Sequence, residues 1–316
     1  MYGYLTKDKK FGDEPEEGAE FDPQDLAGAL DADDVFCLIG TNPKDYGPAK
    51  TVVGPKSDGL VRIENAYVRK AHRAFVYRSH SGRYGEVNSE EGYQNLRRFL
   101  FGRWTVKVGL EGLTSPQDVP GDDQVTWQAD LRLAIRGLPI VLSEQRADQY
   151  CPIQLDDELR RLGDSPDHPV PLLSTFLMDP AELSDTGEVP HEGRARYSLV
   201  LRVSKLAQRN SIFDFSDHLE QVFDWADSLI VDVGPNADRT GIEAYPAWNS
   251  SIGGPIDGFD PITQGLPDAG EHNTPVKAGR SDETWRFSVP LPDVARKLEI
   301  FGDNARLTFQ IEDRDA

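Results

Sequence analysis

The sequence predicts an α+β fold: a segment of short buried strands closed by one helix, then an antiparallel β-sandwich of about eight strands. Residues 35–102 contain continuous apolar runs that end in glycine or turn formers, which is typical of strands buried on both faces. Residues 103–316 instead alternate apolar and polar positions, as strands with one buried face do. Residues 1–34 form an acidic lead-in, which gives three regions in all.

Length and charge limit the functional classes. The 316 residues suffice for two domains with a core each. The net charge is −20, and an acidic chain of this kind is not expected to bind nucleic acid, because neutralising phosphates needs a basic face. Residues 35–101 are the exception, with eleven basic and six acidic residues. They form either a site for anionic substrates or a mildly basic surface that balances the acidic body.

The sequence predicts neither a membrane span nor secretion. No stretch approaches 18 consecutive apolar residues, and the N-terminus lacks the apolar core of a signal peptide. Cys37 and Cys151 are far apart, so neither a disulfide framework nor a zinc site is expected. A cytoplasmic setting is the expectation.

No cofactor or metal ion is expected either. Aspartates at 122–123 and 257–260 lack the spacing of a calcium loop and are interpreted as solvated turns. Four histidines in the second half of the chain show no metal-ligand spacing; they are His168, His191, His218 and His272.

Within the acidic lead-in, Asp22-Pro23 is a good helix start.

The region that follows is expected to begin with two strands. Val35–Thr41 is the first buried strand, and residues 42–56 form a loop. A Ser-Asp-Gly turn at 57–59 follows, and Ala74–Tyr77 is the next buried strand.

A helix closes the first region. The second strand runs into residues 78–82, a turn rich in loop formers. Asn88 or Ser89 can then cap a helix with acids in its first turn. Its apolar residues lie on one face at helical spacing, and Gly102 ends it; they are Tyr93, Leu96, Phe99 and Leu100.

The alternating segments predict the strands of the sandwich. They lie near 104–110, 125–135, 138–142, 172–178, 195–203, 229–233, 285–289 and 307–311. A short helix is expected at 217–226. Residues 234–282 lack periodicity and are rich in Gly and Pro, so a long loop is expected there.

The first region resembles the C-terminal third of an α/β-hydrolase, in the lipase-like branch that includes lecithin–cholesterol acyltransferase and GPI-inositol deacylase relatives. In that fold the acid and the base of the Ser–Asp–His triad follow the last two strands. The resemblance covers residues 35–101 and rests on the strand with Phe-Cys-Leu-Ile-Gly and on the turn Asp58-Gly59-Leu60-Val61. It implies that Asp58 is the triad acid and His80 the triad base. The alternatives are an ordinary Asp-Gly turn and a loop histidine held by backbone groups.

The resemblance lacks a nucleophile. The family's elbow is Gly-x-Ser-x-Gly, and these 316 residues do not contain that motif. The nearest stretch, 249–253, lacks the first glycine, follows no apolar strand and is interpreted as a loop. Cys37 lies inside an apolar run and is expected to be a structural thiol.

The expected function is therefore that of the C-terminal portion of a lipase- or esterase-like serine hydrolase, inactive alone. An N-terminal hydrolase half on another polypeptide would supply the serine, and the substrate would be an ester or a lipid. The alternative is a binding module whose sandwich recognises a protein, lipid or carbohydrate surface beside a vestigial hydrolase segment. A sheet reduced to its last strands would leave the strand at 35–41 with an unpaired edge.

Overall fold

The computed structural model describes residues 24–25, 30–44, 53–114, 124–162, 169–179, 194–208, 223–235, 242–255, 259–260, 276–277, 279–281 and 284–314. The chain divides into two compact units, Met1–Phe99 and Leu100–Ala316. Each unit is described by itself.

The first unit is built on two parallel strands. β1 (Phe36–Gly40) pairs with β2 (His72–Val76) from Phe36 opposite His72 to Gly40 opposite Val76. β1 lies within the predicted run Val35–Thr41, whereas β2 begins two residues before the predicted Ala74–Tyr77 and ends one residue earlier. Three short 3-10 helices, η2 (Ala32–Asp34), η3 (Ile63–Asn65) and η4 (Glu86–Asn88), lie between the longer elements. Apolar side chains of both strands are buried, and so is Ile63 in η3.

Only one edge of β1 is paired with a strand in the described part of the chain. The His72 N–H donates to the Val35 carbonyl at 3.0 Å, and the Thr41 N–H donates to the Val76 carbonyl at 3.0 Å. Backbone groups alternate between the two edges of a strand. The backbone groups of Leu38 and Gly40 therefore face the edge opposite to β2.

Helix α2 (Glu90–Phe101) has the predicted N-cap, since the Ser89 Oγ accepts the Gly92 N–H at 2.9 Å. Its apolar face, however, is largely exposed: Tyr93, Leu96, Leu100 and Phe101 are 54%, 51%, 56% and 66% exposed. The buried positions are Gly92, Gln94, Asn95 and Arg98. Phe99 is the exception among the apolar residues, because its ring stacks on Phe36 at 5.4 Å between centroids. The helix therefore packs mainly through its polar face.

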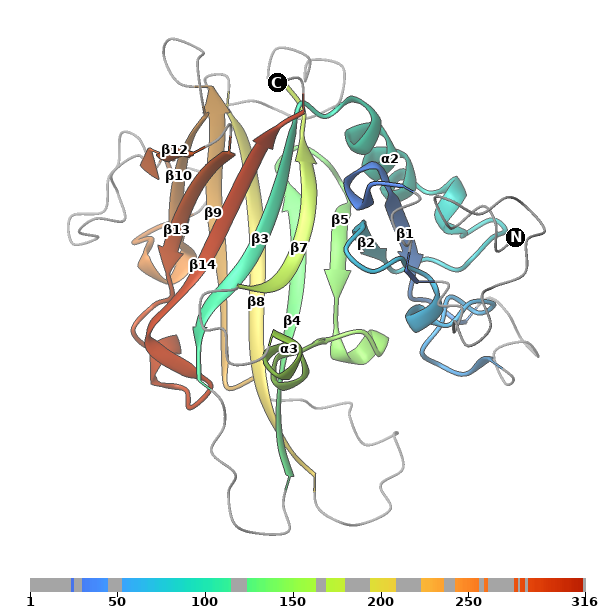
Figure 1. Ribbon diagram of the computed structural model, residues 1–316, viewed down its shortest axis with the longest axis horizontal. Helices are drawn as coiled ribbons and strands as arrows, with labels where there is room; N and C mark the ends of the chain where they lie inside the picture. Colours follow the sequence, from blue (N-terminus) through green and yellow to red (C-terminus); the bar gives the residue numbers. More distant parts are fainter. Residues whose placement is uncertain are drawn as a thin grey trace, which may run out of the picture. The chain divides into compact units, whose positions relative to one another are not determined.

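The second unit consists of two antiparallel sheets, seen as two layers in Figure 1. One sheet has the order β11-β10-β9-β8-β4-β5, with β6 also pairing with β4. The other has the order β12-β13-β14-β3-β7. The strands are β3 (Trp104–Leu113), β4 (Gln124–Ile135), β5 (Val141–Gln145), β6 (Ile153–Gln154), β7 (Val170–Leu177), β8 (Ala195–Gln208), β9 (Trp225–Pro235), β10 (Ile242–Trp248), β11 (Val276–Lys277), β12 (Gly279–Ser281), β13 (Thr284–Pro290) and β14 (Phe301–Asp313). In its described residues the unit also contains helix α3 (Leu155–Leu162) and the short η5 (Ala147–Gln149), η8 (Asn249–Ser251) and η11 (Ala295–Lys297).

The two sheets share one hydrophobic core, which is the arrangement of a β-sandwich. Along β13, buried Trp285, Phe287 and Val289 alternate with more exposed neighbours, as the period-two pattern predicts. The rings of Phe287 and Phe309, opposite each other on β13 and β14, stack at 4.5 Å. The prediction of a β-rich body with antiparallel sheets is confirmed.

Several details of this body differ from the prediction. The expected loop at 234–282 contains β10 and the short strands β11 and β12, and the expected strand at 138–142 begins at Val141 instead. Helix α3 and β6 were not predicted. Residues 217–222 of the expected short helix lie outside the described part, and Trp225 already belongs to β9. These strands are short or interrupted by glycine and proline, so pairing with a neighbour rather than periodicity makes them strands. No helix in the described residues combines the length and apolar character that crossing a bilayer requires.

Candidate active site

Asp58 and His80 meet at the carboxyl end of the two parallel strands. The Asp58 Cβ lies 2.8 Å from the position that a β-carbon on Gly40, the last residue of β1, would occupy. His80 follows the end of β2 by four residues. The carboxyl ends of parallel strands share one edge of a sheet, so loops leaving them converge. Residues 22 positions apart in sequence thus become neighbours.

The Asp58 carboxylate is buried and oriented by the turn that carries it. Its Oδ1 accepts the Leu60 and Val61 N–H groups at 2.9 and 2.7 Å. Gly59 has a φ of 103°, a conformation that a side chain would disfavour, which is why the turn is Asp-Gly. The remaining oxygen, Oδ2, lies 2.8 Å from the His80 Nδ1.

His80 is tied to the same turn through its backbone. The His80 N–H donates to the Asp58 carbonyl at 3.0 Å, so backbone and side chain bond to one residue. The two side chains differ in exposure: 39% for His80 and 4% for Asp58. Because Nδ1 faces the buried carboxylate, the ring has one nitrogen in a hydrogen bond and part of its surface open to solvent.

A third ionisable group, Glu86, belongs to this cluster and was not predicted from the sequence. Oxygen atoms of Asp58 and Glu86 and a ring nitrogen of His80 all lie within 4.8 Å of one another. Glu86 opens η4, and its N–H donates to the Ser79 carbonyl at 2.8 Å, which fixes its backbone beside the His80 loop. No sequence motif distinguishes it from the nearby Glu90 and Glu91.

The environment of Glu86 favours its neutral form. Burial, followed by the charge of Asp58, raises the pKa of Glu86 to about 7, although His80 and a backbone hydrogen bond from Gly40 oppose the rise. Among the described residues, its Oε2 is buried and accepts no hydrogen bond. The Gly40 position explains part of this packing. A β-carbon there would lie 2.7 Å from the Arg78 carbonyl oxygen and 2.9 Å from the Glu86 Oε2, so only glycine fits.

The same three groups could hold a divalent cation. A cation would bind the His80 Nδ1 through the lone pair that is lost when Nδ1 carries a proton. Metal binding and an Nδ1–H···Oδ2 hydrogen bond are therefore mutually exclusive uses of this cluster. Either use depends on the Asp58 carboxylate being ionised.

The other candidates from the sequence do not join this cluster. The 249–253 stretch follows β10 directly, contrary to the expectation that no strand precedes it, and its first three residues form η8. The Ser250 Oγ donates to the Asp227 Oδ2 at 2.5 Å, so its partner is a carboxylate and not the histidine of a triad. Cys37 lies in β1 and Cys151 is buried, which raises the pKa of the Cys151 thiol to about 12. The histidines at 168, 191, 218 and 272 and the aspartates at 122, 123 and 257 lie outside the described residues.

The candidate site thus consists of Asp58 and His80 in hydrogen-bond contact, with Glu86 beside them. A scan against models of known protein families gave no match, and neither did searches of the curated proteins and of the solved structures.

Proposed function

We propose that residues 35–102 are the C-terminal part of an α/β-hydrolase catalytic domain of the lipase or esterase type. In this proposal Asp58 orients His80, and His80 is the general base for a serine that comes from outside this segment. The substrate class is a carboxylic ester, including lipid esters. The observation that carries the proposal is the 2.8 Å contact between the Asp58 Oδ2 and the His80 Nδ1.

The chemistry of a triad fits the two residues. A triad base needs a carboxylate on Nδ1, which fixes the tautomer and stabilises the imidazolium that forms when the base takes a proton. With Nδ1 bonded to Asp58, the other nitrogen, Nε2, is the one that can accept the proton of an attacking hydroxyl. Two N–H donors on the Asp58 Oδ1 hold the carboxyl group in the orientation that points Oδ2 at the ring.

The position of the pair in the sheet also supports the proposal. Acid and base follow two adjacent parallel strands in the order that α/β-hydrolases use. On the edge of β1 opposite to β2, no described strand pairs with Leu38, and at the carboxyl end the Gly40 N–H donates to Glu86. A further parallel strand could join at that edge and bring its own loop to the same end of the sheet. Such a loop is where a nucleophilic serine would emerge.

The first test is the tautomer of His80, which the isolated chain can report. We expect nitrogen NMR to find neutral His80 protonated on Nδ1, and Asp58→Asn to mix the two tautomers because the amide can also donate to the ring. A neutral His80 protonated on Nε2 in the unaltered chain would contradict the proposed pair.

The second test looks for the serine with a fluorophosphonate probe. The purified chain alone should not be labelled. Chain recovered from its native cells with any bound polypeptide should give labelling of a serine on that polypeptide, and His80→Ala should abolish it. Labelling of a serine within residues 1–316 would show that the nucleophile lies in this chain. If the recovered material is never labelled, the pair is a vestigial scaffold and the binding-module alternative gains support.

A further inference from the structure

A hollow lined by three arginines lies on the outer face of the seven-stranded sheet, within the second unit. Its volume is about 120 Å³, and its lining is Asp130, Leu131, Arg132, Arg146, Val200 and Arg202. Core residues alternate with these positions along β4, since Ala129, Leu131 and Leu133 belong to the hydrophobic core. Asp130 and Arg132 therefore project to the face opposite the core.

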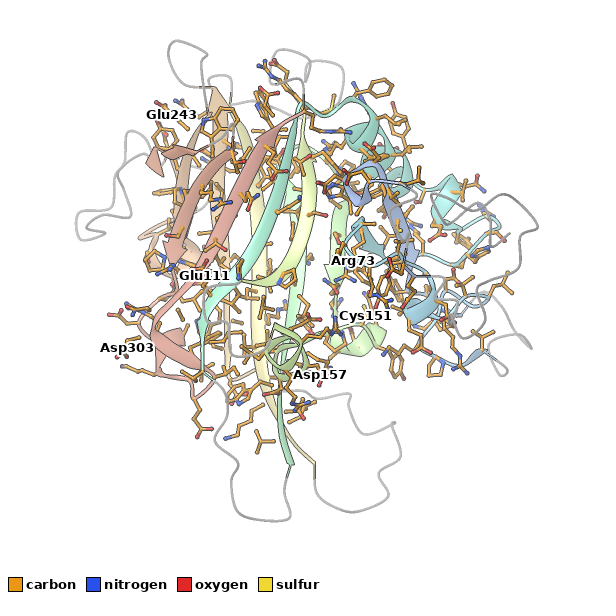
Figure 2. The ribbon with its side chains drawn as sticks, viewed as in Figure 1. Arg73, Glu111, Cys151, Asp157, Glu243 and Asp303 are labelled. Atoms are coloured by element: carbon orange, nitrogen blue, oxygen red, sulfur yellow. The ribbon has the colours of Figure 1, made fainter. Side chains whose placement is uncertain are left out.

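Strand pairing and one loop set the positions of the arginines. β4 and β8 are antiparallel, with Asp130 opposite Arg202 and Arg132 opposite Val200. Arg146 comes from the loop after β5. That loop is held by the Ala147 N–H, which donates to the Asp130 Oδ1 at 2.8 Å, and by the Cys151 N–H, which donates to the Arg146 carbonyl at 3.0 Å. Figure 2 labels Cys151, which marks the end of this loop. The hollow thus rests on paired strands and a bonded loop.

The hollow carries more positive than negative charge. Three guanidinium groups line it against the single carboxylate of Asp130. Arg146 also contacts two carboxylates outside the lining, Asp148 at 2.7 Å and Glu144 at 3.9 Å, so Arg132 and Arg202 provide most of the unbalanced positive charge. In the part of the chain that the structure describes, neither Arg132 nor Arg202 has a carboxylate within ion-pair distance; Arg202 instead lies over the Phe223 ring at 5.2 Å. This concentration stands out because residues 102–316 have a net charge of −17.

Size and chemistry together indicate the ligand. A water molecule takes about 30 Å³ of liquid, and drug-sized ligands need several hundred, so this hollow suits a small group of a few heavy atoms. Guanidinium groups match the oxygens of phosphate and carboxylate and bind them with charge-assisted hydrogen bonds. We propose that the hollow binds a small tetrahedral oxyanion, such as the phosphate or sulfate group of a small molecule. The three arginines come from three elements, β4, β8 and the loop after β5. A tetrahedral oxyanion offers up to four acceptor oxygens, against two on a carboxylate, so it has enough oxygens to accept from all three guanidinium groups.

Asp130 gives the proposal a dependence on pH. Burial raises the pKa of Asp130 to about 6, although the Ala147 N–H, Arg146 and Arg202 oppose the rise and Asp148 adds to it. Below this pH the carboxyl is neutral and no longer repels an anion. Sulfate keeps its double charge between pH 5 and 7.5, so its binding should tighten as the pH falls across this range.

Sulfate binding by calorimetry at constant ionic strength and pH 7.5 tests the proposal. We expect saturable binding that Arg132→Gln weakens roughly tenfold, because one charge-assisted hydrogen bond is lost. Asp130→Asn should act in the opposite direction and tighten binding, because it removes the negative charge that repels the anion. The amide oxygen can still accept the Ala147 N–H, so the loop after β5 keeps its position. The matched control is Arg286→Gln, which removes one exposed arginine from β13 in the other sheet and should leave binding unchanged.

The outcomes separate clearly. Absence of saturable sulfate binding would overturn the proposal. Equal weakening by Arg132→Gln and Arg286→Gln would also overturn it, because it would show a general effect of net charge rather than a site. Acetate that binds as tightly as sulfate would overturn the tetrahedral specificity. Misfolding cannot imitate the expected result, since it would not make Asp130→Asn bind more tightly. None of these outcomes depends on the hydrolase proposal.

Discussion

Glu86→Gln should change the way in which the stability of the first unit depends on pH. The raised pKa of Glu86, about 7 against the ordinary 4.5, means that the folded state keeps this carboxyl protonated where the unfolded state has lost the proton. Between these two values the folded state binds more protons, so stability falls as pH rises. The stabilisation of the folded state by the protonated Glu86 carboxyl is fully present below pH 4.5 and is lost as the pH rises through about 7. Glutamine stays neutral and lacks this dependence.

The size of the effect follows from the shift. A difference of this size between folded and unfolded states corresponds to about 3 kcal/mol if the group is fully shielded. Because the side chain is only partly buried, solvent screening reduces the expected effect to about 1–2 kcal/mol. The wild type and Glu86→Gln should therefore have similar stability at pH 4.5, and the variant should be more stable by this amount at pH 8.

The assay must report the first unit alone, because all five tryptophans lie beyond residue 99 and report the second unit. The protein is equilibrated in urea at each pH and then given a short hydrogen-exchange pulse at one fixed pH. Mass spectrometry of peptides covering β1 and β2 then gives the unfolding midpoint of this unit. The control is Glu64→Gln, since the Glu64 side chain is 52% exposed. If wild type and Glu86→Gln lose stability equally between pH 4.5 and 8, Glu86 does not titrate near neutrality and the reasoning about its burial is wrong.

Four further results are expected. Asp58→Asn should lower the pKa of Glu86, because the Asp58 charge is one of its causes; carbon NMR of the Glu86 carboxyl measures it. Gly40→Ala should destabilise the first unit by about 1–3 kcal/mol in the urea and exchange assay, since the new β-carbon meets a backbone carbonyl oxygen. Asp232→Ala should destabilise the second unit by about 3–5 kcal/mol in urea, followed by tryptophan fluorescence, because it removes the bidentate carboxylate partner of the buried Arg196, whose Nε and Nη2 contact that carboxylate at 2.6 and 2.7 Å. Native-state hydrogen exchange should find lower protection in β1 and β2 than in β4, β8 and β9, because one edge of β1 faces no described strand.

Each of these has a control or a contradicting outcome. An unchanged Glu86 titration in Asp58→Asn would mean that the two carboxyls do not interact. The control for Gly40→Ala is Gly253→Ala. A β-carbon on Gly253 has no atom within 4 Å, so this substitution should leave the stability of the second unit unchanged. Asp293→Ala removes an 84% exposed partner of an ion pair and should cost less than about 1 kcal/mol. Equal protection of β1 and β4 would argue against an open edge.

The site was predictable from sequence only in part. Asp58 and His80 were identified because a turn-forming Asp-Gly and a histidine after a buried strand are local features of the chain. Glu86 was missed because its proximity to Asp58 arises from the 3-10 helix η4 folding back against the end of β1, which no local pattern encodes. The exposed apolar face of α2 was equally invisible, because helical spacing says which residues share a face and not what covers it.

The sequence alone determined the local patterns of apolar and polar residues. These are the apolar runs of β1 and β2, the alternation in the long strands of the sandwich, and the capped helix after the histidine. These are local properties, since a residue's neighbours along a strand or helix fix which face it occupies. Tertiary structure decided what those elements meet. It brought the Asp58 Oδ2 to the His80 Nδ1, added Glu86, and paired β4 with β8 so that Arg132 and Arg202 share one hollow. Contacts between residues distant in sequence depend on register and packing, and one sequence does not show these directly.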